Sequence, residues 1–156
     1  MTFGDTALIE VVTLPVADVD RSTRFYVETL GFTLDVDYAP APNFRVVQVT
    51  PPGSRCSIQF GVGVTDAEPG STRTTYLVVA DLEGAHAQLT AAGVPVSAIR
   101  HKTPQGAWDG SFTHGLDPDR ADYASFADFA DPDGNTWMLQ ERGHQHGSAT
   151  GEPGGV

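Results

Sequence analysis

The sequence predicts an α+β fold made of two βαβββ modules, and two observations carry this prediction. Residues 16–20 (VADVD) are echoed 63 residues later by residues 79–83 (VADLE), and each copy ends an apolar stretch and opens a helix. The two helices also end alike, with LGF at residues 30–32 and AGV at residues 92–94. The duplication implies two similar halves with a cleft between them, and a cleft is where we expect a ligand to bind.

The first half is predicted as one strand, one helix and three further strands. Residues 9–16 are rich in β-branched types, which favour a strand. Asp18 or Asp20 then caps a helix whose apolar residues recur at helical spacings, and Gly31 ends it. Turn-forming Pro and Gly residues separate the strands that follow. These strands are residues 33–38, 44–50 and 57–62.

The second half repeats that order with one exception. Residues 100–122 form a segment that is too long for a simple hairpin, and we expect it to be a lid or binding loop. Residues 67–73 contain Pro and Gly and are predicted to link the halves. The predicted elements of the second half are strand 74–79, helix 82–92, and strands 94–99, 123–129 and 136–141.

The length of 156 residues suits one domain with a sizeable core. We expect this domain to occupy residues 1–142, with module one at about 8–66 and module two at about 74–141. Residues 143–156 are Gly-rich and polar without apolar periodicity, so we expect a disordered tail.

Composition excludes several classes of partner. A formal net charge of −11 disfavours binding to nucleic acid or to an anionic membrane. Apolar runs are far shorter than the roughly 20 residues of a membrane span, and we expect no secretion signal. The lone Cys56 cannot form an internal disulfide and fits a reducing cytoplasm, which is the predicted location. Small molecules and other protein surfaces are the expected partners.

Two motifs in this order resemble the vicinal oxygen chelate superfamily, the group of glyoxalase I, the bleomycin-resistance proteins and the extradiol dioxygenases. The late motif is the Asp-Pro-Asp-Gly-Asn turn at residues 131–135. The resemblance covers about residues 8–141 and implies two modules whose sheets form a cup, with the helices outside and the ligand inside. It also implies a homodimer, and it leaves open whether one chain or two build the cup. The opening motif consists of Val16, Asp18, Ser22, Phe25, Tyr26, Leu30, Gly31 and Phe32.

The resemblance also implies where metal ligands would lie. Metal-dependent relatives place His, Glu, His or Gln, and Glu on strands that face the cup. The matching positions here hold Val11, Gln59, Thr74 and Met138. Three of these four side chains are unsuited to zinc, nickel or iron. We therefore expect no metal ion and no cofactor, and we assign no catalytic residue.

Other polar and aromatic side chains add to the predicted cup. Gln140 faces the same way as Met138, Tyr76 adds a phenol, and Trp108 is positioned to close over an aromatic ligand. His101 and His114 lie on the long segment, and three alternatives stay open for them: a general base, a lid contact or simply an exposed loop residue. The predicted ligand-binding residues are Val11, Gln59, Thr74, Tyr76, Trp108, His114, Met138 and Gln140.

These features favour a metal-independent, bleomycin-resistance-like protein that binds a small apolar or aromatic molecule and sequesters it. The alternative is a metal-dependent enzyme of the same superfamily, a glyoxalase-like lyase or a dioxygenase. Such an enzyme would use non-standard ligands such as Glu10, Gln59, His114 and Glu141. A third hypothesis is a structural partner whose cup is vestigial. The sequence alone does not decide whether the protein is an enzyme.

Overall fold

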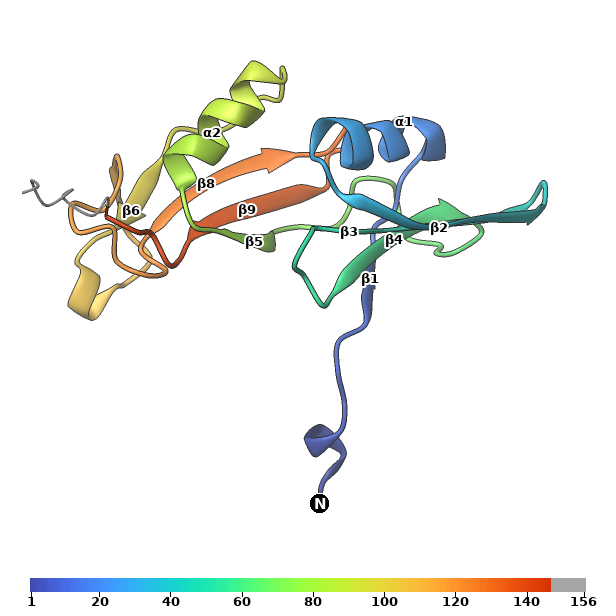
Figure 1. Cartoon of the computed structure of the whole chain (residues 1–156), viewed down its shortest axis with the longest axis horizontal. Coiled ribbons are helices and arrows are strands. Elements are labelled where there is room, and N and C mark those ends of the chain that lie inside the picture. Colours follow the sequence, from blue (N-terminus) through green and yellow to red (C-terminus); the bar gives the residue numbers. More distant parts are fainter. Residues whose placement is uncertain (147–156) are drawn as a thin grey trace, which may run out of the picture.

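The computed structural model describes residues 1–146, which form two β-sheets side by side, with the helices at residues 19–29 and 82–91 on one side of both (Figure 1). The first sheet has the strand order β1-β4-β3-β2, and the second has the order β5-β9-β8-β6-β7. The α+β fold of two modules is therefore confirmed. The elements are η1 (Phe3–Asp5), β1 (Val11–Thr13), α1 (Val19–Thr23), η2 (Arg24–Thr29), β2 (Thr33–Ala41), β3 (Phe44–Thr50), β4 (Ser57–Val62), β5 (Thr75–Val79), α2 (Leu82–Ala91), β6 (Arg100–Lys102), η3 (Gln105–Ala107), β7 (Phe112–His114), β8 (Ser125–Ala130) and β9 (Thr136–Glu141).

The repeat in the sequence is also a repeat in topology. Each sheet has one parallel pair, β1 with β4 and β5 with β9, and its other pairs are antiparallel. The repeated Val-Ala-Asp segment ends in a helix cap in both modules, because Asp18 accepts the Arg21 N–H and Asp81 accepts the Gly84 N–H, both at 3.0 Å.

The core lies between the helices and the sheets. One face of each central strand is buried, with Val47 and Val49 on β3 and Trp137 and Leu139 on β9. This alternation is the period of two that a half-buried strand requires. Tyr26 from η2 is fully buried among aromatic rings of both modules, so one continuous core joins the two halves.

The 131–135 turn connects the two modules. Asp133 accepts hydrogen bonds from the Ala17 N–H at 3.0 Å and from Arg21 Nη2 at 2.9 Å, both at the start of α1. Asn135 donates to the Pro15 carbonyl at 2.9 Å and accepts the Thr72 N–H at 3.1 Å. This late motif therefore ties the second module to the opening motif of the first.

A buried polar chain completes this connection. The Tyr26 hydroxyl donates to Asp131 Oδ2 at 2.7 Å and accepts the Trp137 indole N–H at 3.0 Å. Burial, with the negative charge of Asp131 in support, raises the pKa of the Tyr26 phenol far above its ordinary value. Tyr26 thus remains protonated and acts as a donor. We call Tyr26, Asp131, Asp133, Asn135 and Trp137 the seam.

Two local expectations are wrong. The strand predicted at residues 94–99 is a single bridge between Val96 and Phe129, and the strand itself begins at Arg100. Residues 100–122 are not one long loop, because β6 and β7 pair within them and extend the second sheet. Short polar strands lack the apolar period on which these predictions rested. The predicted first helix is present, α-helical to Thr23 and continuing as a π-helix to Thr29.

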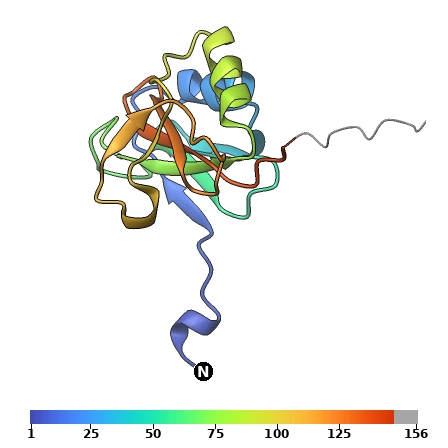
Figure 2. The same ribbon diagram turned by 90° about the vertical axis from the view of Figure 1, so that its left-hand side faces the viewer.

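The N-terminal segment of residues 1–10 runs away from the sheets on the side opposite the helices (Figures 1 and 2). Its Leu8 and Ile9 are 88% and 75% exposed. At the other end, Gly143 donates to Asp122 at 2.7 Å, while residues 147–156 of the expected tail lie outside the described residues. Within residues 1–146, no helix has the length and apolar character needed to cross a membrane.

Candidate functional site

The side of the second sheet that faces away from the helices is the candidate site, and strand register defines it. Tyr76 on β5 is paired with Met138 on β9, and Val78 is paired with Gln140. The same register continues to β8, β6 and β7, so the paired residues share one face. We call this face the open face of the second sheet. Its residues are Tyr76, Val78, Arg100, Lys102, Phe112, His114, Phe126, Asp128, Met138 and Gln140.

Three aromatic rings form a group at the β7 edge of this face. Phe112 lies between Trp108 and Phe126, with ring centroids 5.5 Å and 5.6 Å away and both contacts edge-to-face. The Trp108 and Phe112 side chains are 43% and 39% exposed, whereas Phe126 beneath them is buried. Edge-to-face contacts stabilise such a group and leave ring surface free for a further aromatic molecule.

Two cations lie against these rings. The Lys102 ammonium is 4.6 Å from the Trp108 ring centre and 5.5 Å from that of Phe126. The Arg100 guanidinium is 5.0 Å from the Phe112 ring centre. All three distances are in the range of cation–π attraction. We call Arg100, Lys102, Trp108, Phe112 and Phe126 the aromatic–cation cluster.

Asp128 neutralises one of these cations. Its carboxylate accepts from Arg100 Nη1 at 3.0 Å. Burial alone would raise the pKa of Asp128, but the side chains of Ser97 and Arg100 outweigh it and hold this pKa below its ordinary value. Arg100 Nη2 also lies 3.5 Å from the Met138 sulfur. Asp128, Arg100 and Met138 thus form one connected group across the middle strands of the open face.

The two histidines of the 100–122 segment lie on opposite faces of the second sheet. His114 is paired with Arg100 and lies on the open face. His101 lies on the other face of β6, where its Nδ1 is 2.8 Å from the Gly115 carbonyl oxygen. Only His114 is therefore placed to meet a ligand on the open face.

Two predicted residues lie on the first sheet. Val11 and Gln59 are partly buried on β1 and β4, on the side away from the helices, where Gln59 Nε2 donates to Thr13 Oγ1 at 2.9 Å. Thr74 is exposed just before β5 and has a left-handed φ of 61°, which breaks the strand alternation there. The eight predicted residues therefore divide between two sheets, and Tyr76, Trp108, His114, Met138 and Gln140 gather on or beside the second.

Glu141 cannot join a ligand set on the open face. It follows Gln140 on β9, is fully buried on the helix side, and accepts from Arg120 at 2.7 and 2.6 Å and from the Leu82 N–H at 2.8 Å. Burial alone would raise its pKa, but these donors hold the pKa below its ordinary value. The set of Glu10, Gln59, His114 and Glu141 is therefore not brought together.

A different trio, Asp81, Glu141 and His144, has ligand atoms within 4.8 Å of one another. The Arg120 guanidinium already satisfies both Glu141 oxygens, and its Nη2 also lies 3.5 Å from Asp81 Oδ1. A divalent ion would need to displace this bidentate cation. The trio does not fit a metal site, and the four positions matched to the family's ligands offer no imidazole or carboxylate.

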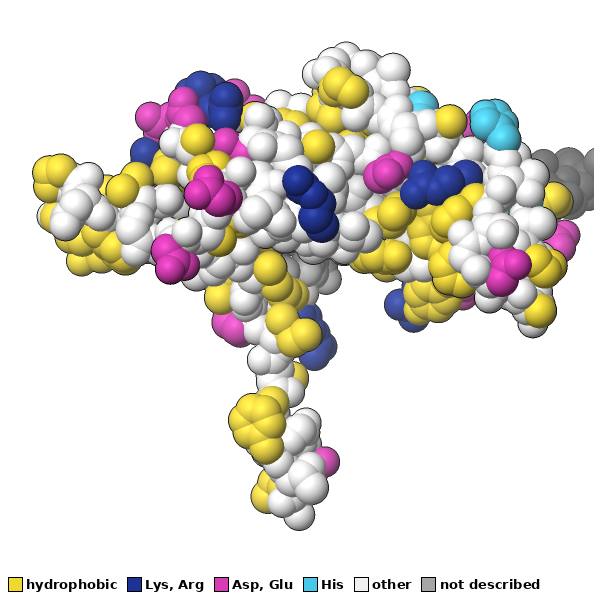
Figure 3. All heavy atoms as spheres, turned by 180° about the vertical axis from the view of Figure 1, so that it is seen from behind, with side chains coloured by type: hydrophobic (Ala, Val, Ile, Leu, Met, Phe, Trp, Pro, Cys, Tyr) yellow, Lys and Arg dark blue, Asp and Glu magenta, His cyan; other side chains and the backbone are white. Residues whose placement is uncertain are grey.

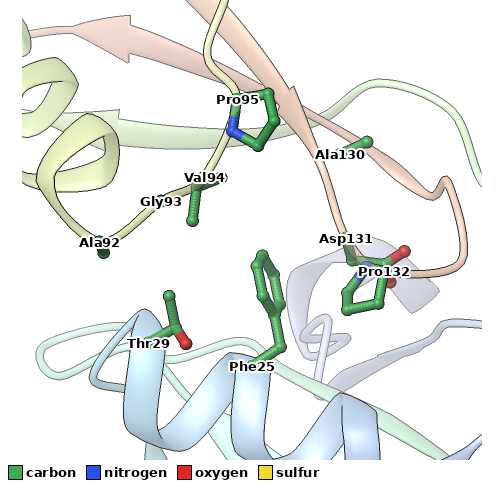
Figure 4. A pocket seen from close by; sticks show the side chains of 9 residues that line it. All are labelled: Phe25, Thr29, Ala92, Gly93, Val94, Pro95, Ala130, Asp131 and Pro132. Carbon is green, nitrogen blue, oxygen red and sulfur yellow. The ribbon is translucent and has the colours of Figure 1, made fainter.

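A cavity lies elsewhere, on the helix side between the modules. It has a volume of about 390 Å³ and is lined by residues of η2, of the end of α2 and of the 131–135 turn, including Phe25, Val94 and Asp131 (Figure 4). Its carboxylate, Asp131, is already saturated by donors of the seam. Thr29 also lines this cavity, and within residues 1–146 its hydroxyl makes no hydrogen bond, so the cavity offers one free neutral polar group and no free charge.

Sequence reasoning missed Arg100, Lys102, Phe112 and Phe126. The prediction of one long loop hid them, since their shared face depends on pairing between β6, β7 and β8. One signal was available, because Lys102 is the only lysine in the chain.

Comparisons with known proteins agree with this architecture. TnmS3, described as an antibiotic binding protein from Streptomyces sp. CB03234, is 29% identical with a TM-score of 0.65, covering 86% of this chain and 95% of that one. A glyoxalase/bleomycin resistance protein from the same strain is 29% identical, with a TM-score of 0.63 and coverage of 85% and 99%. A superfamily member from Sphaerobacter thermophilus DSM 20745 is also 29% identical, with a TM-score of 0.67 and coverage of 88% and 99%.

No curated protein matches the chain. The family described as Glyoxalase/Bleomycin resistance protein/Dioxygenase superfamily matches residues 8–139, which is most of the sequence. The two modules, their register and the match over both halves lead to one conclusion: the chain belongs to the glyoxalase/bleomycin resistance protein/dioxygenase superfamily.

Proposed function

We propose that this protein binds and sequesters a small, mainly aromatic or apolar molecule on the open face of the second sheet. The observation that carries the proposal is the aromatic–cation cluster, whose Trp108 and Phe112 rings are exposed although they belong to a packed group. Exposed aromatic surface beside a few polar groups is typical of a ligand-binding face. Gln140, which is paired with Phe126, supplies such a polar group, and Tyr76 adds a phenol at the far edge of the same face.

The relatives support a binding role. TnmS3 is described as antibiotic binding, and its similarity extends over 86% of this chain. A resistance-type protein acts by holding its ligand and needs no bond-breaking group. We place this activity in the cytoplasm, where the lone Cys56 stays reduced.

The same proposal makes binding metal-independent. Val11 and Met138 stand at two of the four positions matched to the family's ligands, and neither side chain suits a hard divalent ion. No contact on the open face favours the metal-dependent alternative. Metal analysis of protein purified without a His tag tests this point. Stoichiometric metal that is lost in Gln59→Ala would overturn it.

We further propose that the protein works as a homodimer in which the N-terminal arm, residues 1–10, contacts a second copy. The arm projects on the side of both sheets that lies opposite the helices (Figures 2 and 3). Its Phe3, Leu8 and Ile9 side chains are each at least 75% exposed. Apolar side chains on a projecting segment lose water only against another molecule. Hydrophobic side chains also gather on the lower side of the sheets in Figure 3, where a second copy would complete a cup.

Light scattering tests the dimer. We expect twice the mass of one chain for the wild type and the single mass for an Ile9→Asp variant with unchanged far-UV circular dichroism. Thr6→Asp, also exposed on the arm, is the matched control and stays dimeric. A monomeric wild type would contradict this part of the proposal.

A thermal-shift screen followed by calorimetry tests ligand binding. A ligand at 100 times its Kd stabilises the fold by about 2.7 kcal/mol, which is readily measured as a rise in Tm. We expect aromatic compounds among the hits and an affinity at least about tenfold lower in Phe112→Ala. Tyr123→Ala is the control, because Tyr123 is an exposed aromatic beside a cation, Arg142, outside the cluster. Equal losses in both variants would contradict the assigned site.

A further inference from the structure

We propose that the molecule bound at this site is an aromatic acid, whose ring packs on Trp108 and Phe112 and whose anionic group pairs with Lys102. This inference rests on the proposed function and specifies its ligand class. The carboxylate, phenolate or similar group would accept a hydrogen bond from Lys102 Nζ.

The position of Lys102 is fixed by its surroundings. Its backbone is paired with Phe112 across β6 and β7, and its N–H donates to the Ala124 carbonyl at 3.0 Å. Its ammonium lies 4.6 Å from the Trp108 ring centre and 5.5 Å from that of Phe126. Cation–π attraction thus holds the charge beside the ring surface on which a ligand would stack.

The charge of Lys102 is not neutralised by the protein. Within residues 1–146, the ammonium forms no ion pair, and its Nζ makes no hydrogen bond. Its neighbour Arg100, in contrast, is paired with Asp128 at 3.0 Å. Asp109, next to Trp108, is engaged by the Ser111 N–H at 3.0 Å.

The acidic composition of the chain makes an unpaired Lys102 ammonium informative. The chain has 20 acidic residues and 9 basic ones, so carboxylates are abundant as partners. Since Arg100 and Asp128 cancel, Lys102 leaves the aromatic–cation cluster with a net positive charge. An ammonium has three N–H donors, and an aromatic ring is not a conventional hydrogen-bond acceptor for any of them. An anionic oxygen supplies both the missing acceptor and the opposite charge.

The same geometry disfavours a cationic aromatic ligand. An ammonium group on the ligand would meet Lys102 as a like charge beside rings that the lysine already occupies. The acidity of the whole chain acts from farther away and is screened over about 8–10 Å at physiological salt. The local cation therefore decides the sign of the ligand.

Three probes of one shape test the charge preference: 2-naphthoate, 2-naphthamide and 2-naphthylmethylammonium. By calorimetry we expect naphthoate to bind at least about tenfold more tightly than naphthamide, as a charged hydrogen bond implies. In Lys102→Met this preference disappears while the Kd of naphthamide changes by less than about twofold. Lys102→Arg keeps the preference because it keeps the charge. Unchanged far-UV circular dichroism and Tm confirm that both variants fold.

The single lysine also provides a direct readout. In protein labelled with ¹³C-lysine, the Cε methylene gives one side-chain resonance, that of Lys102. We expect naphthoate to shift this resonance with the same Kd that calorimetry gives, and an equal concentration of the ammonium probe to leave it in place.

The outcomes separate this inference from the function on which it rests. Equal affinity for naphthoate and naphthamide, tighter binding of the ammonium probe, or a naphthoate preference that survives in Lys102→Met overturns the aromatic-acid inference and leaves a binding protein. Absence of binding by all three probes at about 1 mM overturns the proposed function as well.

Discussion

The seam and the open face of the second sheet use similar residue types for opposite purposes. In the seam, Asp131 and Asn135 are 5% and 0% exposed, and within residues 1–146 no buried side-chain nitrogen or oxygen lacks a partner. On the open face, Trp108 and Tyr76 are 43% and 52% exposed. The buried carboxylates therefore serve the fold, and the exposed aromatic residues are the ones available to a ligand.

This comparison assigns a structural role to the Asp-Pro-Asp-Gly-Asn motif at residues 131–135. A buried Asp in a family of enzymes invites a catalytic role, yet Asp131 accepts four hydrogen bonds within 3.0 Å from Tyr26, Asp133 and Asn135. Gly70 adds a tight approach, because a Cβ at this position would overlap the Asp133 carbonyl. The side chains of this motif therefore form the hydrogen bonds that join the two modules.

The largest expected effect is in the seam. Asp131→Ala leaves the Tyr26 hydroxyl and the Asn135 donors without an acceptor in a buried site, so we expect the free energy of unfolding to fall by about 3 kcal/mol or more. Asp119→Ala, at an exposed residue, is the control and changes it by less than about 0.5 kcal/mol. Urea denaturation measures both. Similar small effects would mean that the seam does not carry stability.

The next effect concerns Glu141 and its dependence on pH. The pKa of Glu141 is held below its ordinary value of 4.5, so its contribution is complete above pH 4.5 and is lost as pH falls below it. We expect Glu141→Gln to lower stability by about 3 kcal/mol at pH 7. The stability difference between the wild type and Glu141→Gln becomes smaller at acidic pH, because protonation of Glu141 weakens the wild type. Thermal melts from pH 7 to pH 3 check this, and a deficit that is constant with pH would count against the ion pair with Arg120.

A smaller loss is expected for Tyr26→Phe, at about 1.5 kcal/mol. The change keeps the ring in the core but removes the donor to Asp131 and the acceptor for the Trp137 indole N–H. Tyr76→Phe, on the open face, should leave Tm within error because this side chain is exposed. Equal Tm shifts in the two variants would remove the distinction between the two regions.

The smallest effect on stability is expected on the open face itself. Trp108→Ala removes an exposed ring and one hydrogen bond, from its indole N–H to the Ser111 carbonyl at 2.7 Å, so stability falls by less than about 1 kcal/mol. Affinity for an aromatic ligand falls about tenfold in the same variant. A variant with weakened folding and unchanged affinity would assign Trp108 to structure.

Local patterns explain which parts of the molecule the sequence predicts. The repeated Val-Ala-Asp segment contains a helix cap in both copies, and strand alternation places Met138 and Gln140 on one face of β9. Both inferences need only neighbouring residues, which is why they succeed. The facing of these residues follows from the period of two, whereas their proposed contact with a ligand awaits experiment.

The remaining features depend on distant pairing. Asp133 meets Ala17 across 116 residues, so the 131–135 sequence alone indicates only a turn. The strands β6 and β7 have three residues each and no apolar alternation. They are strands because β6 pairs with β8 and β7 then pairs with β6 at the edge of the sheet. The aromatic–cation cluster is a product of that pairing, and so it could not be assembled from spacing.

The most direct test of this account is a crystal structure of the protein with a bound aromatic ligand from the screen. We predict the ligand on the open face of the second sheet, with its ring against Trp108 and Phe112. A ligand in the cavity of about 390 Å³ between η2 and α2, against Phe25 and Val94, would contradict it (Figure 4).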